Sequence, residues 1–393
     1  MIGGTQGVLR VPRWRAESGA RRDRARQHVG HNGGVSPFPS TLRDRTDQAL
    51  ADLSPGYFAL VMATGIVSIG CAEAGLVAVS VVLLVITALA YVVLAAAYIA
   101  RSLRHPGRVR EDQRSPQVAF SYFTIVAGTD VLAVRLLGSG LTVVAVVLLV
   151  LGAALWLVFG YVLPWQVFMT RDGQPILART NGTWFIWSVA SQSLAVGMAV
   201  VHPLLPQYSA LIGILAVLFW SVGTMLYIGI AFMVALRLVH FGITAEQFEA
   251  PYWVSMGALA IAVVAGSSIV GTGSTPMIDA ARSVIGGSVV IFWCFAAWLI
   301  PALLAAGFWR HLIRRIPLRY SPALWSMVFP LGMFAVASMR MGTVEHLPAI
   351  AKVGTAGLGV AGLVWLLVLI SMLVHIARGV LLPHRPHPAE VVS

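Results

Sequence analysis

Long apolar stretches recur along the chain from residue 54 onward, separated by short loops that carry most of the charges. A helix needs about 20 apolar residues to cross the hydrocarbon layer of a membrane, and ten stretches come close to this length. The pattern therefore predicts an all-α polytopic membrane protein whose ten transmembrane helices form five helical hairpins. The expected spans are residues 55–72, 76–100, 118–137, 141–168, 182–201, 209–238, 251–270, 282–308, 323–341 and 348–376.

The two helices of each predicted hairpin differ in polarity. The odd spans contain serine, threonine and glycine, whereas the even spans are runs of Val, Leu, Ile and Ala with Trp and Tyr near their ends, as is typical of lipid-facing helices. We therefore expect the odd helices to form a central pore and the even helices an outer ring. All odd spans would run in one direction, so their N-termini, with their partial positive charge, would meet at one mouth and favour anions there.

Helical geometry at 100° per residue places several polar residues of the odd spans on shared faces. In the third span, Ser121, Thr124, Gly128 and Arg135 fall within about 60° of one another, and in the fifth span three polar residues form an i, i+3, i+4 patch. Close packing of helices is the alternative explanation for such small residues. The residues expected to line the pore are Thr64, Ser68, Ser121, Thr124, Gly128, Ser188, Ser191, Gln192, Ser255, Gly266 and Gly332.

The ninth span carries an aromatic residue and an arginine on one face. Phe329 and Arg340 lie about 16 Å apart along the axis of an ideal helix. Pro330 frees a backbone carbonyl and bends the helix, which can push the preceding side chain into a lumen. Phe329 and Pro330 are therefore the predicted pore gate, with simple core filling as the alternative role of Phe329.

Three charged residues lie within the odd spans. Arg135 and Arg340 lie near the predicted outer ends, where they could attract anions or extend to the interface for purely structural reasons. Asp130 is the deepest carboxylate, and it points away from the polar face of its own helix. We expect it to pair with an arginine or a hydroxyl of another helix, with a proton-linked site as the alternative.

Composition and charge fit a membrane protein. Hydrophobic residues make up 58% of the chain and charged residues only 11%, too few charges for a soluble surface. The net charge of +12 lies in tails and short loops rather than on a groove-sized surface, so we expect no nucleic-acid partner. If the N-terminal tail is cytoplasmic, 23 of the 27 Lys and Arg residues lie inside, which predicts a multi-pass inner or plasma membrane protein with both termini cytoplasmic.

The expected domain organisation has three parts. Residues 1–50 are predicted to be a disordered basic cytoplasmic tail, residues 51–378 the ten-helix domain, and residues 379–393 a C-terminal cytoplasmic tail. The ten histidines are scattered without the spacing of a metal site, so we expect no metal and no cofactor.

Three segments resemble the tellurite-resistance and dicarboxylate-transporter family, which includes malate transporters, sulfite efflux pumps and plant slow-type anion channels. Residues 54–68 (SPGYFALVMATGIVS) are similar to the first membrane helix of that family, residues 320–332 (YSPALWSMVFPLG) to the ninth, and residues 181–184 with Gln192 to the fifth. The resemblance covers residues 54–376. It implies a homotrimer in which each protomer has its own five-helix pore, occluded by an aromatic residue that corresponds to Phe329. The chain lacks the kinking prolines of several inner helices in some relatives.

The resemblance and the residue pattern together predict transport of small anions, either a four-carbon dicarboxylate such as malate or sulfite, chloride or nitrate. The alternative is a proton-coupled carrier for dicarboxylates, or an efflux pump for tellurite and other toxic anions. A membrane enzyme or a purely structural anchor is the third class, and we do not expect an enzyme because no catalytic set is visible.

Overall fold

The computed structural model describes residues 42–169, 173 and 175–381. Within these residues it contains ten helices long and apolar enough to cross a membrane, and no β-strand. The prediction of an all-α polytopic membrane protein with ten spans is therefore confirmed.

Each odd span begins with a short 3₁₀ turn that continues directly into an α-helix. Ser54 and Asn181 cap two of these turns, because their side-chain oxygens accept hydrogen bonds from the N–H groups of Gly56 (3.3 Å) and Thr183 (2.9 Å). Such a cap satisfies an N–H that has no partner within the helix. The odd spans are Pro55–Phe58 with α2 (Ala59–Glu73), Ala119–Tyr122 with α5 (Phe123–Leu137), Gly182–Trp184 with α8 (Phe185–Val201), Ala250–Trp253 with α10 (Val254–Val270) and Pro322–Leu324 with α12 (Trp325–Val344).

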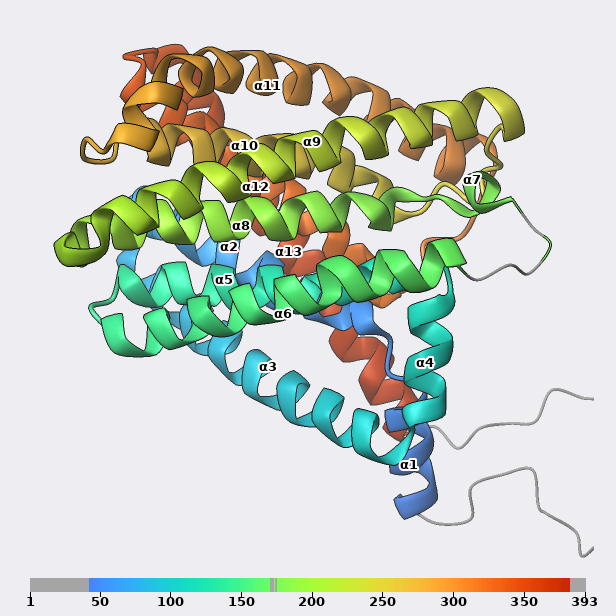
Figure 1. Cartoon of the computed structure of the whole chain (residues 1–393). Coiled ribbons are helices and arrows are strands. Elements are labelled where there is room, and N and C mark those ends of the chain that lie inside the picture. The colour runs from blue at the N-terminus through green and yellow to red at the C-terminus, as the bar shows by residue number, and fades with distance from the viewer. Residues whose placement is uncertain (1–41, 170–172, 174, 382–393) are drawn as a thin grey trace, which may run out of the picture. The chain divides into compact units, whose positions relative to one another are not determined.

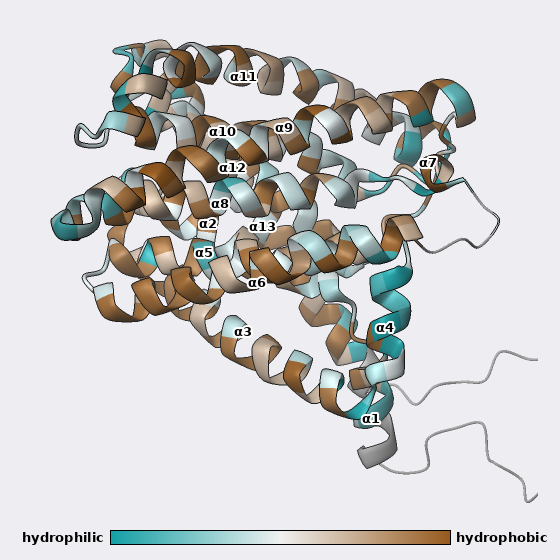
Figure 2. Ribbon diagram, in the orientation of Figure 1, coloured by the Kyte–Doolittle hydropathy of each residue, from teal (hydrophilic) through white to brown (hydrophobic). Residues whose placement is uncertain are grey.

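The even spans are longer and apolar along most of their length, as the brown of α3, α6 and α11 in Figure 2 shows. They are α3 (Val77–Arg104), α6 (Thr142–Met169), α9 (Ser209–Phe241), α11 (Pro276–Phe308) and α13 (Pro348–Leu381). The remaining helices are short: α1 (Leu42–Ala51), α4 (Pro106–Arg114), α7 (Ile176–Arg179), the 3₁₀ turns His202–Leu204 and Pro206–Tyr208, and a π-helical turn at Trp309–Ile313.

The odd helices form a closed ring, since each packs against the next in the order α2, α5, α8, α10, α12 and back to α2. Each even helix packs against the odd helix of its own hairpin (Figure 1). Buried residues make up 67–94% of the most apolar part of each odd span and only 11–50% of the corresponding part of each even span. The predicted inner and outer rings are therefore both present.

Some boundaries differ from those expected from the sequence. Residues 42–50 belong to the segment expected to be disordered, but they form most of α1, and the first residues of the expected C-terminal tail still belong to α13. The eighth span begins at Pro276 rather than at Arg282, which therefore lies inside α11. Residues 1–41 and 382–393, the remainder of both expected tails, lie outside the described residues. Backbone contacts divide the chain into residues 1–49 and 50–393, and all ten spans belong to the second unit.

A candidate pore through the inner ring

The five odd spans present equivalent positions to one common axis. A vestibule at the end where these spans begin, here called the N-side vestibule, is lined by one first-turn residue from each span: Gly56, Ser121, Thr183, Pro251 and Ala323. Counting along each helix from these residues gives a shared register. The residues ten and thirteen positions later line a second, central cavity on every one of the five helices. The hairpins are therefore structural repeats that direct the same helical face towards the axis.

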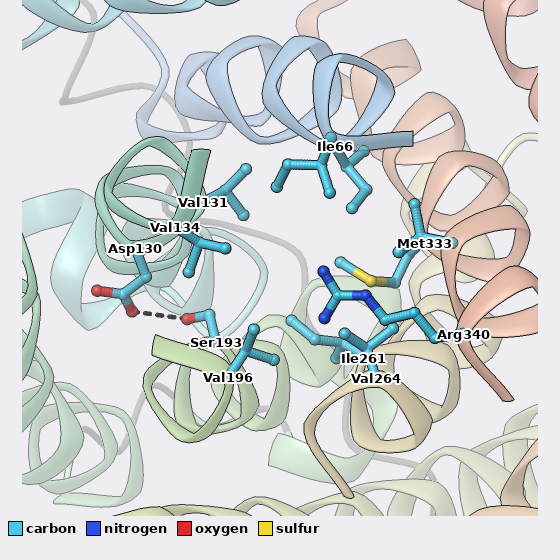
Figure 3. Close-up of a pocket in the computed structure, with 12 residues that line it drawn as sticks. Ile66, Asp130, Val131, Val134, Ser193, Val196, Ile261, Val264, Met333 and Arg340 are labelled. Atoms are coloured by element: carbon cyan, nitrogen blue, oxygen red, sulfur yellow. Dashed lines mark hydrogen bonds between the residues drawn. The ribbon is translucent and has the colours of Figure 1, made fainter. Parts of the chain in front are cut away.

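The central cavity has a volume of about 20 Å³, room for about one water molecule. Two stacked rings of mostly aliphatic side chains surround it, and Figure 3 shows several of them converging from all five helices. The first ring consists of Ile66, Val131, Ser193, Ile261 and Met333, and the second of Ile69, Val134, Val196, Val264 and Val336. The narrow middle of the candidate pore is therefore apolar.

The two ends of the axis are wider and more polar. The N-side vestibule has a volume of about 510 Å³, and its lining includes the predicted pore residues Ser121 and Thr124. On the opposite side of the bundle a pocket of about 360 Å³, here called the C-side pocket, is lined by Glu73, Ser268 and Arg340 among other residues. A polar vestibule, an apolar constriction and a second polar mouth thus follow one another along the axis.

Phe329 lies between two of these cavities along α12. Ser326, one turn earlier, lines the N-side vestibule, and Met333, one turn later, lines the central cavity. Phe329 falls within the same helical face and is only 1% exposed. The residues at the equivalent position of the other four inner helices are Met62, Ala127, Val189 and Gly257. One aromatic ring therefore shares this level with mostly small side chains.

Pro330 contributes to the tight packing at the same level. A Cβ atom added to Gly257 of α10 would lie 2.8 Å from Cγ of Pro330, so only a glycine fits there. Pro330 lies inside α12 and is itself buried. Close approach of α10 and α12 therefore limits the room into which the Phe329 ring can move.

Most of the other predicted lining residues point away from the axis, towards the outer helices. Ser188 and Ser191 donate hydrogen bonds to the carbonyls of Gly223 (2.7 Å) and Phe219 (2.9 Å) in α9. Gln192 donates to Trp220 O at 3.0 Å, and Thr64 accepts from Nε1 of Trp365 in α13 at 3.0 Å. A polar group in an apolar layer is costly without a partner, and the neighbouring helix supplies one. These side chains join inner to outer helices instead of lining the central cavity.

The predicted glycines serve helix packing. A Cβ atom at Gly128 would lie 3.2 Å from the Phe58 ring, one at Gly266 2.5 Å from Val289, and one at Gly332 2.9 Å from Ile66. Ser68 exchanges hydrogen bonds with Ser80 of α3, and Ser255 donates to the carbonyl of Tyr252 in its own first turn. The glycines of the odd spans thus mainly allow close packing of helices, and Ser68 forms hydrogen bonds to a neighbouring helix.

Arg135 is also directed away from the cavities. Its Nε donates to Ser68 Oγ at 2.9 Å, its Nη2 to Ser80 Oγ at 2.8 Å, and its Nη1 to Ser139 Oγ at 2.7 Å. It forms no ion pair with a described residue. The guanidinium group of Arg135 is therefore held by serine hydroxyl groups and not by a carboxylate. Ser80 was not anticipated as a partner from the sequence, because Ser80 belongs to an even span.

Arg340, by contrast, reaches the axis. It lines both the central cavity and the C-side pocket, and Figure 3 shows its guanidinium group among the aliphatic residues. Its Nη2 lies 2.6 Å from Glu73 Oε1, its Nε donates to the same oxygen at 2.7 Å, and its Nη1 donates to Ser268 Oγ at 3.1 Å. These three residues occupy the same level of the shared register on α2, α10 and α12. Sequence reasoning missed Glu73, although comparing the repeats position by position would have aligned it with Arg340.

Asp130 is fully buried, and its Oδ2 accepts a hydrogen bond from Ser193 Oγ of α8 at 2.7 Å. Part of the residue contributes to the wall of the central cavity, but the carboxylate points towards Ser193 (Figure 3). Its Oδ1 has no hydrogen-bond partner among the described residues and faces Gly152 of α6, where an added Cβ atom would lie 2.0 Å from that oxygen. The carboxyl group thus lies between three helices and not in the open lumen.

Comparison with known proteins agrees with this architecture. Residues 52–373 match the voltage-dependent anion channel family. Two similar relatives are uncharacterised membrane proteins of Mycobacterium tuberculosis, from strain CDC 1551 / Oshkosh and strain H37Rv. Each is 42% identical over 152 residues, which cover 39% of this chain and 77% of the relative. The family match over residues 52–373 spans all ten transmembrane helices except the last residues of the tenth. The chain therefore belongs to the voltage-dependent anion channel family.

Proposed function

We propose that the chain conducts small anions through the ring of odd helices, from the N-side vestibule past Phe329 and the aliphatic rings to the C-side pocket. Membership of the family makes anion transport the general function. The shared register carries the more specific proposal, because five helices that direct equivalent positions to one axis align the vestibule and the central cavity along that axis.

The electrostatics of the path favour anions. All five odd helices begin at the N-side vestibule, so the partial positive charge of their N-termini is concentrated there. We propose that this end faces the cytoplasm across the plasma membrane, with both termini on that side, since the positive-inside rule assigns most of the arginines to it. Arg340 supplies positive charge at the other end, partly balanced by Glu73.

Two closures are proposed along the path. Phe329 closes the N-side of the central cavity, because its ring is buried at a level otherwise occupied mostly by small side chains. The ion pair between Arg340 and Glu73 closes the other end, because it holds the guanidinium group of Arg340 between the central cavity and the C-side pocket, at the contact of the neighbouring helices α12 and α2. An anion can pass only when the ring moves aside and the guanidinium group either moves or exchanges Glu73 for the permeating anion.

A channel mechanism is favoured over a proton-coupled carrier. A coupled carrier needs a carboxyl group that can exchange its proton with the lumen. The carboxylate of Asp130 is instead hydrogen-bonded to Ser193 between helices, and that of Glu73, at the C-side pocket, is held in the ion pair with Arg340. Nitrate, chloride, sulfite and malate remain the candidate substrates. A homotrimer with one pore in each protomer is proposed for the assembly, since the even helices expose apolar residues over much of their length, suited to lipid or to neighbouring protomers.

Anion flux into liposomes tests these alternatives. The purified protein is reconstituted, and uptake of nitrate, chloride, sulfite and malate is measured with and without an imposed proton gradient. A channel gives flux that follows the anion gradient and does not respond to the proton gradient at constant membrane voltage. Accumulation of malate driven by the proton gradient would favour the carrier, and absence of flux for all four anions would refute both proposals.

A further inference from the structure

We propose that the N-side vestibule contains a binding site for a small oxyanion, formed by the hydroxyl groups of Ser121 and Ser326 and the guanidinium group of Arg237. The inference rests on the proposed function and adds to it a resting position for the anion, on the N-side of Phe329.

The two hydroxyl groups belong to residues that line the vestibule, and they have no protein acceptor among the described residues. Ser121 and Ser326 are 8% and 7% exposed, both line the vestibule, and neither side chain forms a hydrogen bond with another described residue. The neighbouring threonines differ, because Thr124 donates to Pro55 O at 3.0 Å and Thr183 to Asn181 Oδ1 at 2.6 Å. Both hydroxyl groups can therefore donate hydrogen bonds to a ligand in the cavity.

Arg237 of α9 supplies the charge. It is 6% exposed and lines the vestibule, its Nη1 donates to the Tyr252 hydroxyl, and its Nη2 donates to Gln247 Oε1 at 3.4 Å. Its Nε has no acceptor among the described residues, and the guanidinium group forms no ion pair with any of them. A buried cation without a carboxylate partner is costly unless an anion balances it. The hydrogen bonds that it donates to Tyr252 and Gln247 hold it in position without neutralising it.

The rest of the vestibule reinforces a preference for negative charge. Its lining contains a second arginine, Arg179, and one carboxylate, Glu249. Three of the five spans start without a side-chain cap, at Val118, Glu249 and Ser321. All five helix dipoles direct their positive ends to the vestibule, which favours an anion there.

The donor set indicates the class of ligand. A planar guanidinium group and two hydroxyl groups offer directional hydrogen bonds that match the oxygens of a carboxylate or nitrate better than they match a spherical halide. The volume of about 510 Å³ accommodates anions up to the size of a small dicarboxylate. Ser326 precedes Phe329 by one helical turn, so an anion bound there lies directly against the proposed gate.

Binding is measured separately from transport on the full-length protein in detergent. Titrations with acetate, nitrate, malate and chloride are followed by the broadening of ligand NMR signals, for the wild type, Arg237→Gln and the double variant Ser121→Ala/Ser326→Ala. Removing hydrogen bonds to a charged ligand is expected to raise the half-saturating concentration of the oxyanions about tenfold or more. The matched controls Arg108→Gln, on exposed α4, and Ser255→Ala, whose hydroxyl is satisfied within its own turn, should leave it unchanged.

The possible results distinguish a failure of the proposed binding site from a failure of the proposed pathway. Unchanged oxyanion binding in the folded serine double variant would overturn the site, and this variant keeps the test valid if Arg237→Gln does not fold. Chloride binding as tight as nitrate and acetate binding would overturn the oxyanion assignment. If the wild type conducts anions into liposomes but shows no measurable binding, the site is refuted and the pathway is not. If the wild type binds oxyanions, the variants weaken this binding and no flux is measured, the pathway is refuted and the site is supported.

Discussion

Replacement of Phe329 by alanine is the most direct perturbation of the proposed pore. The ring is 1% exposed in the closed structure, so moving it aside would bring its apolar surface into contact with water in the lumen. Full exposure of a buried Phe side chain costs about 1.5–3 kcal/mol, which corresponds to a preference of about 10- to 150-fold for the closed state. Phe329→Ala is therefore expected to raise anion flux by up to that factor.

The assay is nitrate flux into liposomes at equal amounts of folded protein, checked by size-exclusion elution and thermal unfolding in detergent. Phe→Ala in a core costs about 3–5 kcal/mol of stability, so Phe329→Leu serves as a milder variant that should raise flux only slightly. Phe334→Ala is the matched control, because this phenylalanine of the same helix stacks on Trp293 of α11 at 5.9 Å. It should lower stability without raising flux.

Two results would refute this reasoning. If folded Phe329→Ala conducts no more than the wild type, the ring is core filling and the constriction lies elsewhere. If Phe334→Ala raises flux as much as Phe329→Ala, the increase reflects general loosening of α12 and not removal of a gate. An increase smaller than tenfold that becomes larger when Glu73→Gln is added would identify the Arg340 ion pair as the remaining closure.

Three further predictions concern charged and packing residues. Glu73→Gln should raise flux by about two- to fivefold in the liposome assay, because a partly exposed ion pair contributes about 1 kcal/mol or less and its loss releases Arg340. Lower flux would contradict the proposed closure by the ion pair of Arg340 and Glu73. Gly152→Ala should lower the thermal unfolding midpoint, because the new Cβ atom would lie 2.0 Å from Asp130 Oδ1, and an unchanged midpoint would mean that α6 shifts freely. Arg135→Gln should lower the thermal unfolding midpoint and leave the relative fluxes of nitrate and chloride unchanged, because the side chain is hydrogen-bonded to Ser68 and Ser80. A changed ratio of nitrate to chloride flux would indicate that the charge of Arg135 acts on the permeating anion.

The ten-helix architecture follows from the pattern of residues along the chain. Span length and alternating polarity are local properties, because a helix that crosses a membrane must satisfy its own backbone and its apolar length must match the hydrocarbon layer. The ten spans and the two rings could therefore be predicted from the order of residues. The spacing of Phe329 to Arg340 along one helix places both on one face of α12, and the role of Phe329 as a gate stays a prediction.

Which face of each inner helix meets the axis depends on how the helices pack against one another. A serine hydroxyl in an apolar layer needs an acceptor, and either a water-filled lumen or the backbone of a neighbouring helix can provide one. Polarity alone therefore could not distinguish Ser188, which bonds to α9, from Ser121, which opens into the vestibule. The pairing of Arg340 with Glu73 joins residues 267 positions apart, so it depends on how α2 and α12 pack in the ring and on no local pattern.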